Sequence, residues 1–331
     1  MESTVKDNQK KANRISVIKG NENLERLVKK KATRILLGIF KWLVLIGVAY
    51  IVLSPLINIF ASSFFSASDM YNPAVFLLPM EATLDAYRSA FLRMDYWSTL
   101  AQTAVYTLTL TIIQVFITSM VGYGFARFDF PFKKILFACV ILTIVIPTHT
   151  IMIPLYMLFR NFDPFGVLSL FANGPQNWLG STRPVYLMTL FGSGLRSGLF
   201  IYIFNQFFRG LPKEIEEAAF IDGAGAFYTY FRVMIPNAIP SIVTVTVFSV
   251  VWQYNDTFYP RLFALNSGSL MSMRISTLQS TVAFLDEIKD PVVQQIYLHA
   301  GIVLVLIPVV VFYILLQRQF IEGIERSGIV G

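Results

Sequence analysis

The chain has 331 residues, of which 55% are hydrophobic and 14% are charged, and its formal net charge is +7. This balance excludes a disordered chain and disfavours a soluble globular protein, because a soluble protein of this size needs roughly 25% charged residues to cover its surface. The charge is absent from several long, separate stretches, and we expect lipid to be the solvent of those stretches.

The first 34 residues form a basic segment. Residues 1–34 contain ten Lys or Arg against four Asp or Glu, so they carry +6 of the total charge. The rest of the chain is almost neutral, which argues against a nucleic-acid-binding face. Anionic lipid headgroups are the more suitable counter-charge. We expect residues 1–34 to be a basic cytoplasmic tail and residues 35–331 to form a transmembrane domain.

Uncharged apolar runs predict an all-α integral membrane protein with six transmembrane helices. The runs lie at about 42–60, 97–122, 135–159, 185–208, 234–255 and 296–316. The third run would extend about 37 Å as one helix, which exceeds the roughly 30 Å of hydrocarbon in a bilayer. Continuous hydrophobicity also argues against a membrane β-barrel, whose strands alternate apolar and polar residues.

Glycine and proline within these runs have local consequences. Gly194 and Gly198 form a small-xxx-small pair, which is typical of a close helix crossing. Prolines in or near the spans are expected to kink them and to leave carbonyl groups without an intrahelical partner. These prolines are Pro147, Pro154, Pro240 and Pro308.

The distribution of Lys and Arg predicts the orientation of the spans. With the N-terminus in the cytoplasm, the inner segments hold nineteen Lys or Arg and the outer segments hold seven, with Arg196 assigned to neither side. Cytoplasmic loops carry the excess of positive charge, so we expect both termini in the cytoplasm. The outer connections at about 61–96, 160–184 and 256–295 are long, and a partner that delivers substrate has room to dock there.

The loop between the fourth and fifth spans, residues 209–236, is the most informative stretch. It predicts a short helix, because Pro212 suits the first helical position and three Glu follow near the positive end of the helix dipole. Ala218, Ala219 and Gly223 would give this helix a surface of small side chains, which another protein can approach closely. An amphipathic helix lying at the membrane interface is the alternative that composition alone favours.

This loop resembles the Glu-Ala-Ala loop of binding-protein-dependent ABC importer permeases. The shared pattern is Glu217-Ala218-Ala219, three residues, Gly223, nine residues and then Val233-Met234-Ile235-Pro236. Further strings, taken as an ordered set, resemble the carbohydrate-uptake, maltose-type branch of that family. They are Gly122–Phe128, Ile146-Pro147 with Ile153–Tyr156, Trp252–Asp256 with Pro260, and Gln317–Gly323.

The resemblance implies the ABC importer permease fold, in which the short helix is a coupling helix seated in a separate ATP-binding subunit. The residues implied in this coupling are Glu216, Glu217, Ala218, Ala219, Asp222, Gly223 and Pro236. The chain has no Gly-x4-Gly-Lys-Ser/Thr phosphate loop, so ATP and Mg²⁺ are expected on partner subunits and no cofactor on this chain. We expect a transport subunit that carries motion and has no catalytic residues.

The resemblance also implies the surroundings of the chain. The expected partners are a second homologous permease, two ATP-binding subunits, an extracytoplasmic sugar-binding protein and membrane lipid, without nucleic acid. The expected location is the plasma membrane of a bacterial-type cell. The expected function is to translocate a sugar or oligosaccharide that the binding protein delivers.

Four residues near the outer face are candidates for the substrate pathway. Arg196 interrupts the fourth span, and a cation at that depth is costly unless it faces water, protein or a partner charge. It either lines the translocation cavity or extends to the outer interface. Tyr254, Asn255 and Asp256 are able to hydrogen-bond sugar hydroxyls, with packing at a helix end as the alternative. The two His have no ligand pattern, and no metal site is expected.

Two other functions are alternatives to import by an ABC system. A secondary transporter driven by an ion gradient needs intramembrane acids, or interrupted helices arranged in internal repeats. A polytopic membrane enzyme should carry clustered His, Asp or Glu at a membrane face. Neither pattern is convincing in this sequence.

Overall fold

A computed structural model describes residues 2–171, 174–266, 268 and 270–328, with side chains from residue 30 to residue 318 except Ala32 and Phe171. Residues 1 and 329–331, at the ends of the predicted tail and transmembrane domain, lie outside this description. The chain divides into two compact units, Met1–Ala61 and Ser62–Gly331.

The described residues of the first unit all belong to one helix, α1 (Glu2–Ser62), which is 61 residues long. Its segment Thr33–Ser62 has a mean hydropathy of 2.4 and is long enough to cross a membrane. The large apolar side chains of this segment are exposed, as with Trp42 and Ile51. Such a surface is stable in lipid, and it contains the first span predicted from the sequence.

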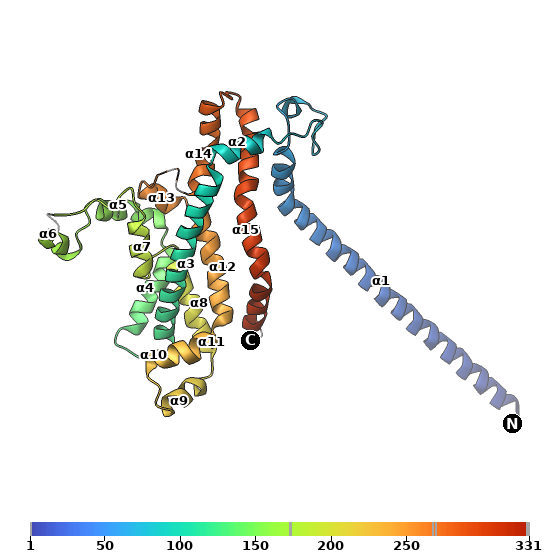
Figure 1. The fold of residues 1–331 in the computed structure, drawn as a ribbon. Coiled ribbons are helices and arrows are strands. Elements are labelled where there is room, and N and C mark those ends of the chain that lie inside the picture. The colour runs from blue at the N-terminus through green and yellow to red at the C-terminus, as the bar shows by residue number, and fades with distance from the viewer. Residues whose placement is uncertain (1, 172–173, 267, 269, 329–331) are drawn as a thin grey trace. The chain divides into compact units, whose positions relative to one another are not determined.

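Four long helices organise the second unit (Figure 1). They are α3 (Tyr96–Arg127), α8 (Ser197–Gly210), α12 (Ile239–Asn255) and α15 (Pro291–Gly328). Helix α3 packs along α8 and α12, and α12 packs against α15. The contact face of α8 is a stripe of Phe200, Phe204 and Phe208, four residues apart and fully buried, as the helical period requires.

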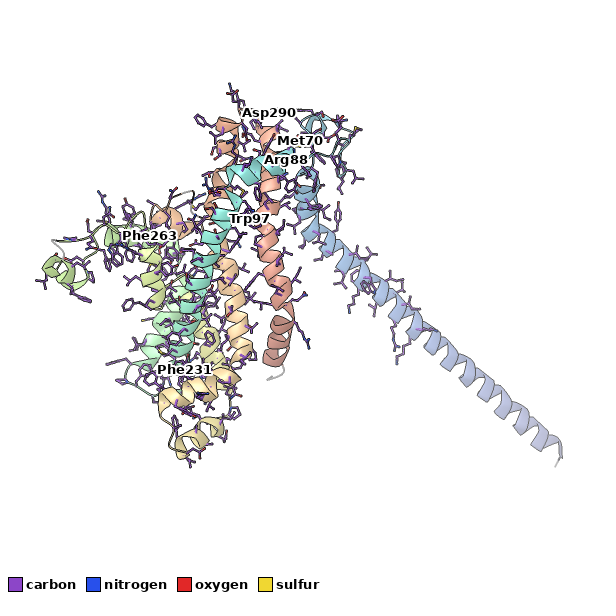
Figure 2. All side chains as sticks on the ribbon, viewed as in Figure 1. Met70, Arg88, Trp97, Phe231, Phe263 and Asp290 are labelled. Carbon is purple, nitrogen blue, oxygen red and sulfur yellow. The ribbon has the colours of Figure 1, made fainter. Side chains whose placement is uncertain are left out.

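The other helices among the described residues complete this unit. They are η1 (Asp69–Tyr71), α2 (Asp85–Arg93), α4 (Lys133–Val145), η2 (Thr148–Ile151), α5 (Met152–Arg160), η3 (Pro164–Gly166), α6 (Val167–Phe171), α7 (Arg183–Leu190), α9 (Glu214–Ile221), α10 (Ala226–Thr229), η4 (Tyr230–Met234), α11 (Ile235–Asn237), α13 (Phe258–Leu262) and α14 (Met271–Leu285). Arg88, Trp97 and Asp290 lie at one end of the unit and Phe231 at the other (Figure 2). We call these the α2 end and the α9 end.

Small residues allow close helix crossings. A Cβ at Gly122 on α3 would lie 2.6 Å from the Cβ of Phe204 on α8, and a Cβ at Gly198 would lie 3.0 Å from the carbonyl oxygen of Val140 on α4. The close crossing predicted at Gly198 is therefore confirmed. A Cβ at Gly194 would instead meet Thr189, so that glycine serves the turn between α7 and α8.

The third predicted span is not one continuous helix. Helix α4 ends at Val145, and the segment Thr148–Arg160 that follows is bent from it by 101°. The expectation of one continuous 37 Å helix is wrong, because Pro147 provides no N–H and forces the preceding residue out of the helical region, which gives a break and not only the expected kink. Ile146 accordingly has a ψ of 122°.

The all-α membrane fold is confirmed, whereas the count of six spans is not. Within the described residues, three helices are long and apolar enough to cross a membrane, and the number rises to five if each of two bent pairs is one span. The fourth predicted span is divided between α7 and α8. The fifth contains a 79° bend between Ala226–Asn237 and Ile239–Asn255.

The predicted outer loop 256–295 contains more structure than expected. It holds α13 and the 15-residue helix α14, which packs against α15 and α2. At the α14–α15 crossing, a Cβ at Gly301 would lie 2.9 Å from the Cδ1 of Ile275. The α2 end is therefore a packed cap of helices on the longer spans.

Candidate functional site

Helix α9 lies beside α10 and α11, at the end of the second unit opposite α2 (Figure 1). It begins at Glu214, and the carbonyl of Lys213 accepts hydrogen bonds from the N–H groups of Glu216 and Glu217 at 3.0 Å each. Pro212 therefore lies ahead of the helix, so the prediction that it occupies the first helical position is wrong. The short helix itself is where the sequence placed it.

The exposed surface of α9 combines small, acidic and apolar side chains. Glu217, Ala218 and Asp222 are exposed, and Ala219 is half-buried. Ile221 at the end of the helix is 86% exposed, and Phe227 shortly after it is 74% exposed. Large apolar side chains grouped on a polar, protruding segment are typical of a surface that another protein covers.

Gly223 terminates α9 in the left-handed conformation, with a φ of +81°. The N–H of Gly223 donates to the carbonyl of Phe220, and the N–H of Ala224 donates to that of Ala219, both at 3.0 Å. These bonds satisfy carbonyl groups that a helix end leaves free. A Cβ at Gly223 would meet nothing within 4 Å, so the backbone conformation, and not crowding within this chain, is the reason for glycine here.

Pro236 lies where the chain returns toward α12. It is exposed and occupies the first turn of α11, directly after the π-helical turn η4. Proline cannot donate to the carbonyl four residues before it, which is that of Arg232 inside η4. An irregular turn at this point is consistent with that missing hydrogen bond.

Glu216 differs from its neighbours because it points into the protein. Its carboxylate Oε1 accepts a hydrogen bond of 2.5 Å from the Tyr123 hydroxyl, and its Oε2 lies 3.2 Å from Nε of Arg127. Arg127 also donates from Nη2 to the carbonyl oxygen of Leu211 at 2.8 Å. The Arg127 and Glu216 side chains are only 4% and 8% exposed. Tyr123 and Arg127 both belong to α3, so this contact joins α3 to α9.

A cleft of about 760 Å³ opens beside this contact. The charged residues that line the cleft are predominantly basic, and Phe125, Phe137 and Phe220 line it as well. The charged lining residues are Arg127, Asp129, Lys133, Lys134, Arg209, Lys213, Glu216 and Glu217. Lys133 is paired with Asp129 at 3.1 Å, so part of this charge is already compensated within the chain.

The three consecutive substrate-pathway candidates at the end of α12 do not form one polar cluster. Tyr254 is buried and donates from its hydroxyl to the carbonyl of Val305 at 2.9 Å, so it fastens α12 to α15. Asn255 is exposed, but its Nδ2 donates to the carbonyl of Val251 on the same helix at 2.8 Å. These two contacts give both residues roles at the helix end.

Asp256 is buried directly after α12. Its Oδ1 accepts from the N–H of Phe258 at 2.8 Å, which starts α13, while its Oδ2 has no hydrogen-bond partner among the described residues. Burial raises the pKa of this carboxyl to about 6, and the backbone hydrogen bonds oppose that rise. Asp256 is thus a carboxyl with one acceptor atom to spare.

Arg196 occupies the turn before α8 and is exposed, with a left-handed φ of 59°. Its guanidinium lies 5.6 Å from the ring centroid of Trp252 on α12, within the range of a cation–π interaction. The turn is held by Gln114 of α3, whose Nε2 donates to the carbonyl of Leu195 at 2.6 Å and to the Ser197 hydroxyl at 3.1 Å.

The structure therefore adds Tyr123 and Arg127 to the residues that surround the candidate coupling loop. The sequence contained both in the Gly122–Phe128 string, which served only to identify a family branch. No spacing rule connects them to Glu216, which is 93 residues beyond Tyr123. Within the described residues, no group of three or more His, Cys, Asp or Glu is arranged to hold a metal ion.

Comparison with known families identifies the segment that includes α9. Residues 114–326 match the family described as "Binding-protein-dependent transport system inner membrane component". The chain is 25% identical over 299 residues to the arabinooligosaccharides transport system permease protein AraQ of Halalkalibacterium halodurans, covering 88% of this chain and 98% of AraQ. It is 27% identical over 256 residues to the trehalose transport system permease protein SugB of Mycobacterium tuberculosis, covering 77% and 85% of the two chains.

Solved structures share the fold. A chain of a bacterial ABC transporter involved in the import of the acidic polysaccharide alginate matches with a TM-score of 0.67 and 22% identity, over 86% of this chain and 96% of that chain. A chain of a bacterial alginate ABC transporter, solved in complex with a periplasmic protein bound to an alginate pentasaccharide, matches with a TM-score of 0.56 and 14% identity, over 85% and 94%.

Proposed function

Because this chain belongs to the family of binding-protein-dependent transport system inner membrane components, we propose that it is a permease subunit of an ATP-driven sugar importer. It is a multi-pass protein of the inner membrane. The proposed orientation places the α9 end and both termini in the cytoplasm, with residues 1–34 as a basic tail beside anionic lipid, because the excess of Lys and Arg then lies inside.

The observation that carries this proposal is the exposed surface of α9. Glu217, Ala218 and Ala219, followed by the glycine turn at Gly223, present a narrow helix that a groove can grip, and Ile221 adds an apolar tip. The proposed occupant of that surface is one of two ATP-binding subunits, which bind ATP and Mg²⁺. In this arrangement Asp222 lies at the rim, and Pro236 begins the return to the membrane.

Transport then follows from a shift between conformations. ATP binding closes the ATP-binding subunits, moves α9 and favours an outward-open cavity between this chain and a second, homologous permease. An extracytoplasmic binding protein releases its sugar into that cavity, and hydrolysis of ATP resets the pair. This chain transmits motion and needs no bond-breaking chemistry of its own.

The proposed substrate is a sugar or an oligosaccharide, because arabinooligosaccharides and trehalose are the substrates named for its relatives. A periplasmic protein in complex with a transporter of the same fold supports delivery by a binding protein. Arg196 and Asp256, with a guanidinium and a spare carboxylate oxygen at neighbouring helix ends, are the proposed polar contacts of the pathway. Tyr254 and Asn255 would act there by holding the end of α12.

Import by the reconstituted complex tests this function. The chain is assembled in proteoliposomes with its partner permease, the ATP-binding subunits and the sugar-loaded binding protein, and accumulation of labelled sugar is measured. We expect accumulation to require ATP and the binding protein and to survive a protonophore. Accumulation that proceeds without ATP and collapses with the proton gradient would establish a secondary transporter instead.

A further inference from the structure

The contact between α3 and α9 is unusual because it is ionic and buried. Three ion pairs occur among the described side chains, and the partners of the other two are considerably more exposed than Arg127 and Glu216. Removing two charges from water is unfavourable, so a buried pair contributes little net stability, whereas the loss of one partner is strongly destabilising. Stability alone is therefore a weak reason for an ion pair at this position.

The pair also involves the one buried side chain of α9. All eight residues of α9 are described, and Glu216 alone among them is buried. Helix α9 also packs against α10 and η4, but its link to α3 consists of the Arg127 ion pair and the hydrogen bond from Tyr123. Tyr123 and Arg127 are four residues apart on α3, so both point from the same face of that helix.

Helix α3 is suited to carry a displacement away from this contact. It is a single helix of 32 residues, which corresponds to about 48 Å from the α9 end to the α2 end. It packs along α8 and α12, and the Gly122 crossing with Phe204 lies directly beside Tyr123. A force applied to Glu216 reaches the packed helices through α3 without passing through the turns that flank α9.

We propose that Tyr123, Arg127 and Glu216 form a latch that transmits the movement of α9 to α3. The three are positioning residues, because they act through the helices and touch neither ATP nor sugar. Glu216 faces inward in this latch, whereas Glu217 and Ala218 face outward toward the partner subunit. The latch rests on the proposed function, since it needs a partner that moves α9.

The test measures sugar imported and ATP hydrolysed on the same proteoliposomes of the complete complex. The main variant carries Arg127→Met together with Glu216→Leu, because replacing both members of a buried ion pair by apolar residues is usually tolerated. We expect this complex to assemble and hydrolyse ATP but to import about tenfold less sugar per ATP than wild type. Tyr123→Phe, which removes only the hydroxyl, should give a smaller decrease in the same ratio.

Glu214→Gln is the matched control, since it removes an exposed carboxylate from the same helix and should leave sugar per ATP unchanged. A wild-type ratio in the double variant overturns the latch, and so does an equal loss in Glu214→Gln. If the double variant does not assemble, Tyr123→Phe decides, and a wild-type ratio in that variant overturns the latch. Absence of ATP-dependent import by the wild-type complex is a different result, because it refutes the proposed function itself.

Discussion

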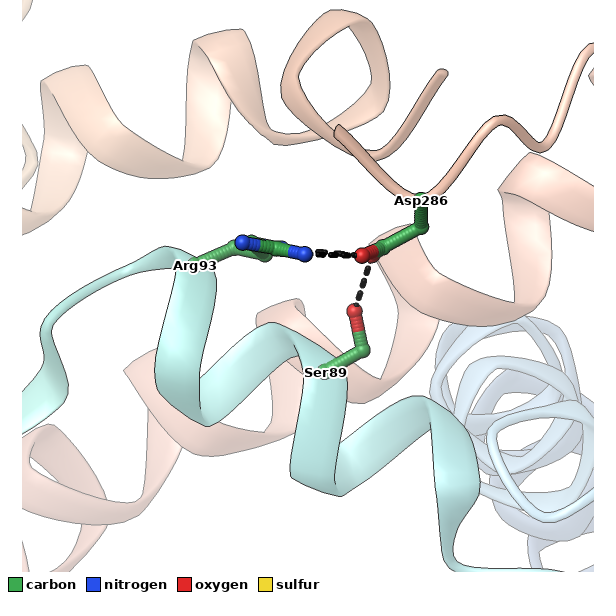
Figure 3. A network of polar contacts seen from close by, with 3 residues as sticks. All are labelled: Ser89, Arg93 and Asp286. Carbon is green, nitrogen blue, oxygen red and sulfur yellow. Dashed lines mark hydrogen bonds and ion pairs between the residues drawn. The ribbon is translucent and has the colours of Figure 1, made fainter. Parts of the chain in front are cut away.

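Arg93 at the end of α2 pairs with Asp286 after α14, although 193 residues separate them (Figure 3). The Arg93 Nε donates to Oδ1 of Asp286 at 2.9 Å, Nη2 makes a second contact with the same oxygen, and the Ser89 hydroxyl donates to Oδ2 at 2.5 Å. These contacts connect the first and last thirds of the second unit. They join α2 to the end of α14 within the cap at the α2 end.

This contact predicts a pH dependence of stability. The hydrogen bond from Arg93 lowers the pKa of Asp286, so its ionised form stabilises the folded protein above the ordinary carboxyl pKa, and that stability is lost as pH falls through the lowered value. Asp286→Asn should reduce stability by about 0.5–1 kcal/mol at pH 7, and by less below about pH 4. Thermal unfolding of the purified protein at several pH values measures this. Glu287→Gln, at the adjacent exposed carboxylate, should behave as wild type throughout, and a constant deficit in Asp286→Asn would contradict the assignment.

The pH dependence of stability that arises from Asp256 should have the opposite sign to that from Asp286. Its pKa is raised to about 6 by burial, so the stability of the neutral form is complete below the unfolded-state value and is lost as pH rises through about 6. Asp256→Asn should therefore stabilise the protein at pH 7.5, by on the order of 2 kcal/mol, and the gain should disappear toward pH 4. Thermal unfolding tests this with the exposed Asp95→Asn as control. A destabilised Asp256→Asn at pH 7.5 would show that the ionised carboxylate is compensated.

The end of α9 gives a prediction about the proposed docking surface. Gly223→Ala places a side chain on a backbone with positive φ, which costs about 1–2 kcal/mol, so affinity for the ATP-binding subunit should fall about fivefold or more. Gly223→Asn should lower the affinity less than Gly223→Ala does, because Asn tolerates this conformation. Gly225→Ala is the matched control, since Gly225 has a φ of −76° and open space around its Cβ position. The affinity of each of the three variants for the ATP-binding subunit is measured in detergent. An equal loss of affinity in Gly225→Ala would mean that the added methyl group, and not the backbone conformation, weakens binding.

The α3–α8 crossing predicts a contrast between two glycines on the same helix. Gly122→Ala forces a Cβ to within 2.6 Å of Phe204 Cβ, and overpacking of this kind should destabilise the second unit by about 1–3 kcal/mol. Gly124→Ala meets nothing within 4 Å and should match wild type or exceed it slightly, since Ala favours a helix. Thermal unfolding in detergent separates them. Equal unfolding temperatures of the two variants would show that α3 and α8 are farther apart at Gly122 than in the structure.

Hydropathy was sufficient to predict the membrane class and, within the described residues, three of the six spans as continuous helices. The run at 97–122 is continuous, apolar and without proline, and it lies within a single helix, α3 (Tyr96–Arg127). Where proline interrupts a run, the pattern cannot distinguish a kink from a break, and at Pro147 the chain turns by 101°. Helix α14 was missed because Ser, Thr, Gln and Arg interrupt its apolar positions, so no long hydrophobic stretch marks it.

The candidate site was predictable only in part, for a related reason. The short helix and its terminating glycine follow from local rules, since Glu near the start and Gly after the end are helix signals. The burial of Glu216 does not follow from them, because Glu214 and Glu217 on the same turn are exposed. Its partners lie on α3, far away in the sequence, and only the tertiary structure brings them together.

Photo-crosslinking tests the docking of α9 most directly. A photoreactive amino acid at position 218 is activated in the assembled complex, and position 97, which is exposed at the α2 end (Figure 2), serves as the control. If α9 transmits the force of an ATP-driven partner, position 218 will crosslink to the ATP-binding subunit and position 97 will not. Crosslinks from position 218 to lipid alone, in every nucleotide state, would contradict the proposed coupling.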